Sequence, residues 1–225
     1  MDGILVVDKP KGWTSHDVVD FIRKGFGLKK VGHAGTLDPM ATGVLVLLIG
    51  KYTKSSNTFI ADDKEYAGTF LLGAESDTQD ADGKITATGK PTNFADDEIR
   101  AVFDKFLGRI EQKPPMYSAV KINGKKLYQL ARKGVAADPK PRQVDIYSLV
   151  VKKIAIPEIS FTVVCSKGTY VRQLAADIGR ALGCGAYLSA LARTRSGIFG
   201  MDIAMGVDAI KKLKTVELEA KLIRP

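Results

Sequence analysis

The stretch Gly32–Ile49, GHAGTLDPMATGVLVLLI, determines how this chain folds around its most informative residue. Its second part, Val44–Ile49, is an unbroken apolar run with the length of a buried strand. Its first part is a loop of small residues that carries one acid, Asp38. Pro39 disfavours helical geometry in the residue before it, so we expect the carboxylate on a tight loop anchored by the strand.

This loop supports two interpretations. Asp-Pro pairs often only open turns, and the dipeptide alone favours that structural explanation. The whole string, with His33 near its head and glycines that let a ligand or another backbone approach closely, favours a functional one. A single acid in this setting indicates chemistry at one carbon rather than metal binding.

Size and composition limit the classes of protein to which this chain can belong. The 225 residues suit one large domain or a domain with a small appendage. No basic leader and no apolar run long enough to span a membrane is present in the sequence. Cys165 and Cys184 are unclustered, which predicts a reduced, cytoplasmic setting. His16 and His33 are the two histidines, so we expect no metal centre based on histidine.

The net charge of +9 is concentrated in one segment. Residues 113–153 contain ten Lys or Arg against two acids, Asp138 and Asp145, which leaves that segment at +8. A solvated surface would explain a charge run, but clustered cations also match the phosphates of a nucleic acid. We therefore expect a polyanion to bind there.

The periodicity of apolar residues predicts the elements. Helices are expected over Thr14–Gly25, Asp96–Leu107, Lys125–Lys133 and, capped by Thr169, up to Gly183. Strands are expected over Val44–Ile49, Glu65–Gly73, Met116–Ile122, Arg142–Lys153 and Glu158–Ser166, with a turn at Asn123-Gly124. Because helical crossovers do not regularly join these strands, the pattern predicts an α+β fold with a mixed, mostly antiparallel sheet flanked by helices and loops.

Two further strings carry polar side chains. The acids in DTQDADG, residues 77–83, invite a calcium site, but an EF-hand aligned on Gly83 would need an acid where Thr78 stands. We interpret that string as a turn. In SKGTYVRQLAAD, residues 166–177, Tyr170 and Arg172 begin a helix, and an arginine there suits a carboxylate partner. A core tyrosine and a surface arginine are the alternative.

Four strings together, GHAGTLDPMATGVL, KEYAGTFLLGAESDTQDADG, QKPPMYSAVKINGKKLYQLARKG and SKGTYVRQLAADIG, resemble the TruB-type tRNA pseudouridine synthases. VVDKPKGWTS near the N-terminus is similar to the opening motif of that family. The resemblance extends in order from about Gly3 to about Phe199 and implies the pseudouridine-synthase fold.

The resemblance implies that the protein isomerises uridine to pseudouridine in the T-loop of tRNA, at position 55, with neither cofactor nor metal. The target base is flipped out of its stack. The resemblance also assigns a role to each matching residue: Asp38 as the catalytic nucleophile or base, Tyr66 stacking on the base, Arg172 pairing with Asp38, His33 filling the vacated place in the RNA, Tyr170 lining the pocket, Leu191 closing its apolar wall, and Lys125, Lys126, Arg132 and Lys133 meeting the RNA backbone of the T-arm.

The same resemblance predicts the organisation of the chain and its partners. We expect a catalytic domain over residues 1–200 and a short C-terminal helical extension over 201–225, with a helix within Val207–Leu222. Bacterial members of the family usually continue into a small RNA-binding domain, often of PUA type, so the expected absence of a full PUA-type domain departs from the family pattern. The protein is expected to act on tRNA as a cytoplasmic monomer with no membrane contact and no obligatory protein partner. A guide-RNA-dependent catalytic subunit and an RNA chaperone without chemistry are the two alternatives.

Overall fold

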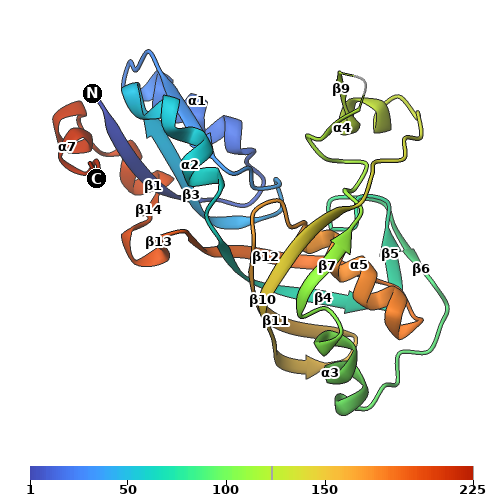
Figure 1. Ribbon diagram of the computed structural model, residues 1–225. Coiled ribbons are helices and arrows are strands. Elements are labelled where there is room, and N and C mark those ends of the chain that lie inside the picture. Colours follow the sequence, from blue (N-terminus) through green and yellow to red (C-terminus); the bar gives the residue numbers. More distant parts are fainter. Residues whose placement is uncertain (123, 225) are drawn as a thin grey trace. The chain divides into compact units, whose positions relative to one another are not determined.

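The computed structural model describes residues 1–122 and 124–224 (Figure 1). The chain forms two compact units, one of Met1–Ala67 with Leu191–Pro225 and one of Gly68–Ala190. Strands β4 (Lys64–Leu72) and β12 (Ala186–Ser196) each run from one unit into the other. Among the described residues, no helix is both long and apolar enough to cross a membrane.

The first unit is built on β3 (Thr42–Ile49), which is buried from Gly43 onward, as its apolar sequence predicts. Neighbouring strands follow the order β14-β1-β3-β12. Strand β1 (Gly3–Lys9) is antiparallel to β3, β12 is parallel to β3, and β14 (Met205–Gly206) is parallel to β1. Strand β2 (Val31–Ala34) also pairs antiparallel with β3.

The remaining elements of the first unit are mostly short helices. Helix α1 (Ser15–Gly25) is confirmed, and Thr14 and Asp17 form the capping box at its start. Residues 50–60 form η1 (Gly50–Ser55) and α2 (Ser56–Ile60), and β13 (Phe199–Gly200) and η2 (Met201–Ile203) follow β12. Within the predicted C-terminal helical region lie two short helices, α6 (Val207–Lys211) and α7 (Thr215–Ala220).

In the second unit the strand order is β4-β11-β10-β7. The long strand β10 (Arg142–Ala155) pairs antiparallel with both β11 (Glu158–Cys165) and β7 (Gly108–Gln112). Two small hairpins lie outside this sheet, β5 (Ala74–Ser76) with β6 (Ile85–Ala87), and β8 (Lys121–Ile122) with β9 (Lys125–Lys126). The helices are α3 (Asp96–Asp104), α4 (Leu127–Ala131) and α5 (Val171–Leu182).

Aromatic packing joins α3 to this sheet. The rings of Phe70 and Phe161 stack with their centroids 4.0 Å apart, and Phe103 of α3 lies 5.6 Å from Phe70. All three side chains are buried, so the apolar stripe of α3 serves the core, as its spacing predicts. With mixed strand directions and helices packed around the strands, the predicted α+β class is confirmed.

Several predicted boundaries differ from the structure. Helix α3 ends at Asp104 because the next amides, of Phe106 and Leu107, bond to carbonyls three residues back and tighten the last turn. Tyr170, rather than Thr169, is the N-cap of α5, since the Thr169 hydroxyl donates to the carbonyl of Ser166.

The predicted strand over Met116–Ile122 is wrong except for β8. The carbonyls of Tyr117 and Ser118 accept hydrogen bonds from Arg172 and from the amide of Tyr128, so they are not available to a strand ladder. Helix α4 is shorter than predicted because Lys125 and Lys126 belong to β9. In the predicted Asn123-Gly124 turn, Asn123 lies outside the described residues.

Candidate active site

Asp38 opens a β-turn in the first unit. The amide of Ala41 donates to the carbonyl of Asp38 at 3.1 Å, and Pro39 occupies the second position of the turn. Leu37 and Met40 are each 3% exposed, so they anchor the loop in the core, while Asp38 itself is half-buried. The Asp-Pro turn therefore exists, and it holds Asp38 on a loop that two buried apolar side chains anchor.

Polar groups from β1 and the start of α1 fix the residues on both sides of Asp38. The ammonium of Lys9, fully buried, donates to the carbonyls of Trp13 at 2.6 Å and Pro39 at 3.3 Å. The hydroxyl of Ser15 accepts from the amide of Leu37 at 2.8 Å. These contacts hold the loop's own backbone in place. Sequence reasoning missed Lys9, although a lysine that ends an apolar strand is an unusual core residue.

Three more predicted site residues belong to the first unit: Leu191, Tyr66 and His33. Leu191 lies beside the start of β3, since Ala192 pairs with Thr42 in the parallel register. Tyr66 of β4 is 9% exposed, and its neighbour Glu65 accepts a hydrogen bond from Thr194 of β12 at 2.9 Å. The first unit therefore places Leu191 next to the loop of Asp38, and it places the strand of Tyr66 against β12.

His33 lies on β2, in register with Leu47 of β3. Its Nδ1 is buried without a hydrogen-bond partner among the described residues. Burial, followed by the positive charge of Arg193 and a smaller contribution from His16, lowers the pKa of His33 below its ordinary value of 6.5. His33 is therefore neutral at physiological pH.

The second unit brings Tyr170 and Arg172 together at the start of α5. The guanidinium carbon of Arg172 lies 5.9 Å from the centroid of the Tyr170 ring, a cation–π distance. Gln112, buried at the end of β7, fixes the backbone of Tyr170. Its Oε1 accepts from the Tyr170 amide at 2.7 Å and its Nε2 donates to the Tyr170 carbonyl at 3.1 Å. No local pattern in the sequence pointed to Gln112.

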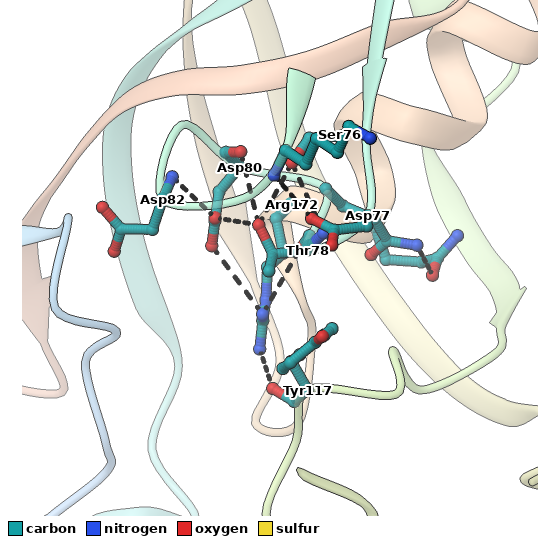
Figure 2. A network of polar contacts seen from close by, with 10 residues as sticks. Ser76, Asp77, Thr78, Asp80, Asp82, Tyr117 and Arg172 are labelled. Atoms are coloured by element: carbon teal, nitrogen blue, oxygen red, sulfur yellow. Dashed lines mark hydrogen bonds and ion pairs between the residues drawn. The ribbon is translucent and has the colours of Figure 1, made fainter. Parts of the chain in front are cut away.

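Arg172 is buried in a polar network within the second unit (Figure 2). Nη2 donates to the carbonyl of Tyr117 at 2.6 Å, and Nη1 donates to the carbonyl of Thr78 at 3.4 Å. Nη1 also lies 3.7 Å from Oδ2 of Asp80, a distance at which two buried charges attract strongly. Asp80 is therefore a carboxylate partner of Arg172 that sequence reasoning assigned only to a turn.

The loop around Asp80 is held by its own side chains, as Figure 2 shows. Oδ1 of Asp80 accepts from the Thr78 hydroxyl at 2.5 Å and from the Asp82 amide at 3.1 Å. Oδ1 of Asp77 accepts from the Lys84 amide at 2.8 Å. Across the described residues, no three His, Cys, Asp or Glu side chains gather to hold a metal ion. These bonds fit the interpretation of DTQDADG as a turn.

The expected pairing of Arg172 with Asp38 joins residues of different units. It stays a prediction. What the second unit contributes by itself is an arginine whose guanidinium is oriented by Asp80 and the Tyr117 carbonyl.

The four predicted RNA-backbone residues form a cluster that we call the basic arm. It consists of Lys125, Lys126, Arg132 and Lys133. The cations of Lys126 and Arg132 lie 5.6 Å and 5.5 Å from the ring centroid of Tyr128, and the remaining two are exposed. Two of the four positive charges of the basic arm thus lie beside one aromatic ring.

A second group of cations lies in the first unit. A pocket of about 510 Å³ is lined by four lysines together with residues of the N-terminus. These lysines are Lys29, Lys30, Lys51 and Lys54. The charge count along the sequence did not single them out, because they come from two separate segments that the fold brings together.

Family models match most of the chain. The N-terminal domain of TruB family pseudouridylate synthases matches residues 23–171, and the C-terminal domain of tRNA pseudouridylate synthase B matches residues 172–224. The chain belongs to the TruB family of pseudouridylate synthases, enzymes that isomerise uridine to pseudouridine in RNA.

Two curated relatives show how close the similarity is. The tRNA pseudouridine synthase B of Opitutus terrae is 48% identical over 223 residues, which cover 99% of this chain and 92% of that protein. The tRNA pseudouridine synthase B of Syntrophotalea carbinolica is 49% identical over 211 residues, which cover 94% of this chain and 69% of that protein.

Solved structures share the fold. A chain in the crystal structure of a Cbf5-Nop10-Gar1 complex matches with a TM-score of 0.76 and 33% identity, over 99% of this chain and 60% of that one. A chain of an H/ACA RNP bound to a substrate RNA containing 2'-deoxyuridine gives a TM-score of 0.72 and 29% identity, over 99% and 56%. The present chain spans less than two thirds of the length of these solved chains.

The network around Arg172 leads to a first prediction. We expect Asp80→Asn to lower the free energy of unfolding by about 3 kcal/mol, because it removes the charge that balances a buried guanidinium. Turnover of uridine should fall with it, since Arg172 loses its orientation. Asp77→Asn, an exposed acid of the same loop, is the control. Urea titration and pseudouridine formation measure both effects, and an Asp80→Asn protein as stable and active as the wild type would contradict the prediction.

The lowered pKa of His33 leads to a second prediction. Below pH 6.5 the unfolded chain binds a proton at His33 that the folded chain resists, so stability is fully present above pH 6.5 and falls as the pH drops. Because one proton is involved, the free energy of unfolding changes by at most about 1.4 kcal/mol per pH unit. We expect His33→Gln to make the loss of stability shallower in denaturant titrations between about pH 5 and 7. His16→Gln, at an exposed histidine, is the control, and equal slopes in His33→Gln and wild type would refute the assignment.

Proposed function

We propose that this protein converts uridine to pseudouridine at position 55 in the T-loop of tRNA. The observation that carries the proposal is the single carboxylate of Asp38, held on a rigid turn by the bonds of Lys9 and Ser15 to its neighbours. Curated relatives that match nearly the whole chain are named tRNA pseudouridine synthase B, which supports tRNA as the substrate.

The proposed reaction exchanges one glycosidic bond for another. The carboxylate of Asp38 assists as the bond from the ribose to N1 of uracil breaks, acting as nucleophile or base at the sugar. The detached uracil turns, C5 forms the new bond to the ribose, and the proton on C5 passes to solvent while N1 takes up a proton. No atom is gained or lost overall, so the reaction needs no other reactant.

The other site residues receive roles around the flipped base. Tyr66 stacks on the uracil and transfers a proton, and Tyr170 and Leu191 line the pocket that excludes water. His33 fills the place that the base leaves in the RNA, and its lowered pKa supports entry as an uncharged ring.

Arg172 is proposed to pair with the carboxylate of Asp38. The contacts of its guanidinium with Asp80 and with the Tyr117 carbonyl support this role, because they fix the cation in one orientation before substrate arrives. A pre-oriented guanidinium forms a charge-assisted hydrogen bond at a smaller entropic cost.

The basic arm is proposed to bind the phosphates of the T-arm. Three of its four cations are exposed, and two of the four lie beside Tyr128, which supports this assignment, since clustered Lys and Arg bind RNA by releasing counterions. The four lysines of the pocket in the first unit add a second positive surface. We further propose that the protein works as a cytoplasmic monomer, a setting supported by the two unclustered cysteines of the sequence, Cys165 and Cys184.

Two alternatives remain to be tested against this proposal. A guide-RNA-dependent subunit is suggested by the similarity to a chain from a complex with Nop10 and Gar1. An RNA chaperone would bind tRNA without chemistry. A bare T-arm hairpin and the purified protein alone discriminate among them. Pseudouridine in the hairpin supports the stand-alone enzyme, product only with guide RNA supports the subunit, and tight binding without product supports the chaperone.

The role of Asp38 leads to a third prediction. We expect Asp38→Asn to lower the single-turnover rate by more than about 1,000-fold, since it removes the group that acts at the sugar. The thermal midpoint should stay near that of the wild type because the turn bonds through its backbone. Tritium release from uridine labelled at C5 measures turnover, with Asp97→Asn on the exposed face of α3 as control. Tritium release by Asp38→Asn at the wild-type rate would eliminate the assignment.

The basic arm leads to a fourth prediction. Replacing Lys125, Lys126, Arg132 and Lys133 by Gln should weaken tRNA binding and reduce the slope of log K against log salt by up to about three. Filter binding over a range of salt concentrations measures the slope.

The matched control for the basic arm changes the same number of charges elsewhere. It replaces Lys211, Lys212, Lys214 and Lys221, all exposed in the C-terminal region, by Gln. If both quadruple variants reduce the slope equally, net charge rather than the basic arm governs binding, and the assignment is lost.

A further inference from the structure

Arg193 of β12 is a buried cation that none of the roles above includes. Its side chain is 1% exposed. Nε donates to the carbonyl of Val44 at 2.7 Å, and Nη2 donates to the carbonyl of Gly35 at 3.1 Å. One guanidinium therefore bridges two backbone carbonyls that are nine residues apart in the sequence.

These two carbonyls lie on the two sides of the loop that carries Asp38, where the chain enters and leaves it; we call these two sides the stems of the loop. The ladder between β2 and β3 ends with the pair Ala34 and Val46, and beyond it the two chains separate into the loop. Gly35 and Val44 lie just past that last pair. The guanidinium of Arg193 thus connects the two sides of the loop beyond the last residue pair of the β2–β3 ladder.

The backbone of Arg193 packs on the same loop. Arg193 pairs with Gly43 in the parallel register of β12 and β3. A Cβ on Gly43, whose φ is +96°, would lie 2.3 Å from the carbonyl oxygen of Arg193, so only glycine permits this approach. At the other stem, a Cβ on Gly35 would lie 3.4 Å from Nη1 of Arg193. The stem at Gly43 is therefore shaped to fit Arg193, and the stem at Gly35 leaves room for ordinary van der Waals contact with it.

We infer that Arg193 is a positioning residue for the reaction at Asp38, because it clamps the two stems of the catalytic loop and so fixes where the carboxylate stands. The inference rests on the proposed function of Asp38. Arg193 need not touch the RNA in this role. Its charge also contributes to the lowered pKa of His33, which places its electrostatic influence at the head of the same loop.

The chemistry of the side chain explains why an arginine is required. Its planar fork offers donors at fixed separation, and it stays protonated when buried. A lysine could reach one carbonyl at a time, and an apolar residue would leave two buried carbonyls without partners. A loop released at one stem could shift Asp38 by a fraction of an ångström, which is enough to slow a reaction that depends on positioning.

Arg193→Lys tests the inference in the full-length protein. We expect the single-turnover rate of pseudouridine formation to fall by about 10- to 100-fold. The Kd for tRNA should stay within about twofold, because phosphate contacts lie elsewhere. Hydrogen exchange at the amides of Leu37 and Ala41 should become faster than in the wild type. Arg195→Lys, two residues along the same strand and half-buried, is the matched control and should leave all three quantities unchanged.

Two readouts separate positioning from mere stability. The single-turnover rate is divided by the fraction of protein that is folded. If the rate of Arg193→Lys then equals that of the wild type, the variant only lowers the amount of folded protein, and the inference is overturned. Wild-type rate and wild-type exchange in Arg193→Lys would also overturn it. If Arg193→Lys does not fold, Arg193→Gln is measured in the same way, and failure of both to fold would make Arg193 a folding residue instead.

The exchange measurement also keeps this inference distinct from the proposed function. If the wild type makes no pseudouridine, the proposed function fails, while exchange at Leu37 and Ala41 still reports whether Arg193 clamps the loop. Unchanged exchange in an otherwise active enzyme would reject the clamp and leave the proposed function standing.

Discussion

The loop that carries Asp38 depends on the rule that buried backbone groups need hydrogen-bond partners. The ladder between β2 and β3 ends before the loop, so its carbonyls and amides cannot be satisfied by strand pairing. Lys9, Ser15 and Arg193 supply the missing donors and acceptor from three separate elements. The burial of two cations, Lys9 and Arg193, is therefore explained by one loop that must be rigid without being a strand.

The second unit also contains a buried cation, and the partners of that cation include a carboxylate. Arg172 is also buried, but its charge faces the carboxylate of Asp80 as well as the carbonyl of Tyr117. That arrangement orients the guanidinium, and Gln112 does the same for the backbone of Tyr170. Each unit thus organises its own share of the predicted site internally, the first a carboxylate and the second a cation with an aromatic ring.

The sequence predicted what is local and missed what is distant. Helix α1, with its capping box, and the buried strand β3 follow from short-range patterns, and the family motifs pointed to Asp38 and Arg172. Gln112 bonds to a residue 58 positions away, and Lys9 to one 30 positions away, so no window of sequence contains both partners. The loss of the strand at Met116 has the same origin, because Arg172 and the amide of Tyr128 decide where those carbonyls bond. The early end of α3 is a local effect instead, since the amides of Phe106 and Leu107 bond to carbonyls three residues back.

The distribution of charge shows the same difference between residues that are close in the sequence and residues that only the fold brings together. A count along the chain finds the basic arm because its residues lie within one segment, and Tyr128 then draws Lys126 and Arg132 together. The lysines of the pocket lie in two segments that become neighbours because β2 pairs with β3, with Val31 opposite Ile49, and η1 follows β3. Because one positive surface belongs to each unit, attraction for a polyanion does not rest on the basic arm alone. Under the proposed function, an RNA therefore has two positive surfaces available to its phosphates, and the loop of Asp38 is left to hold its carboxylate in a fixed geometry.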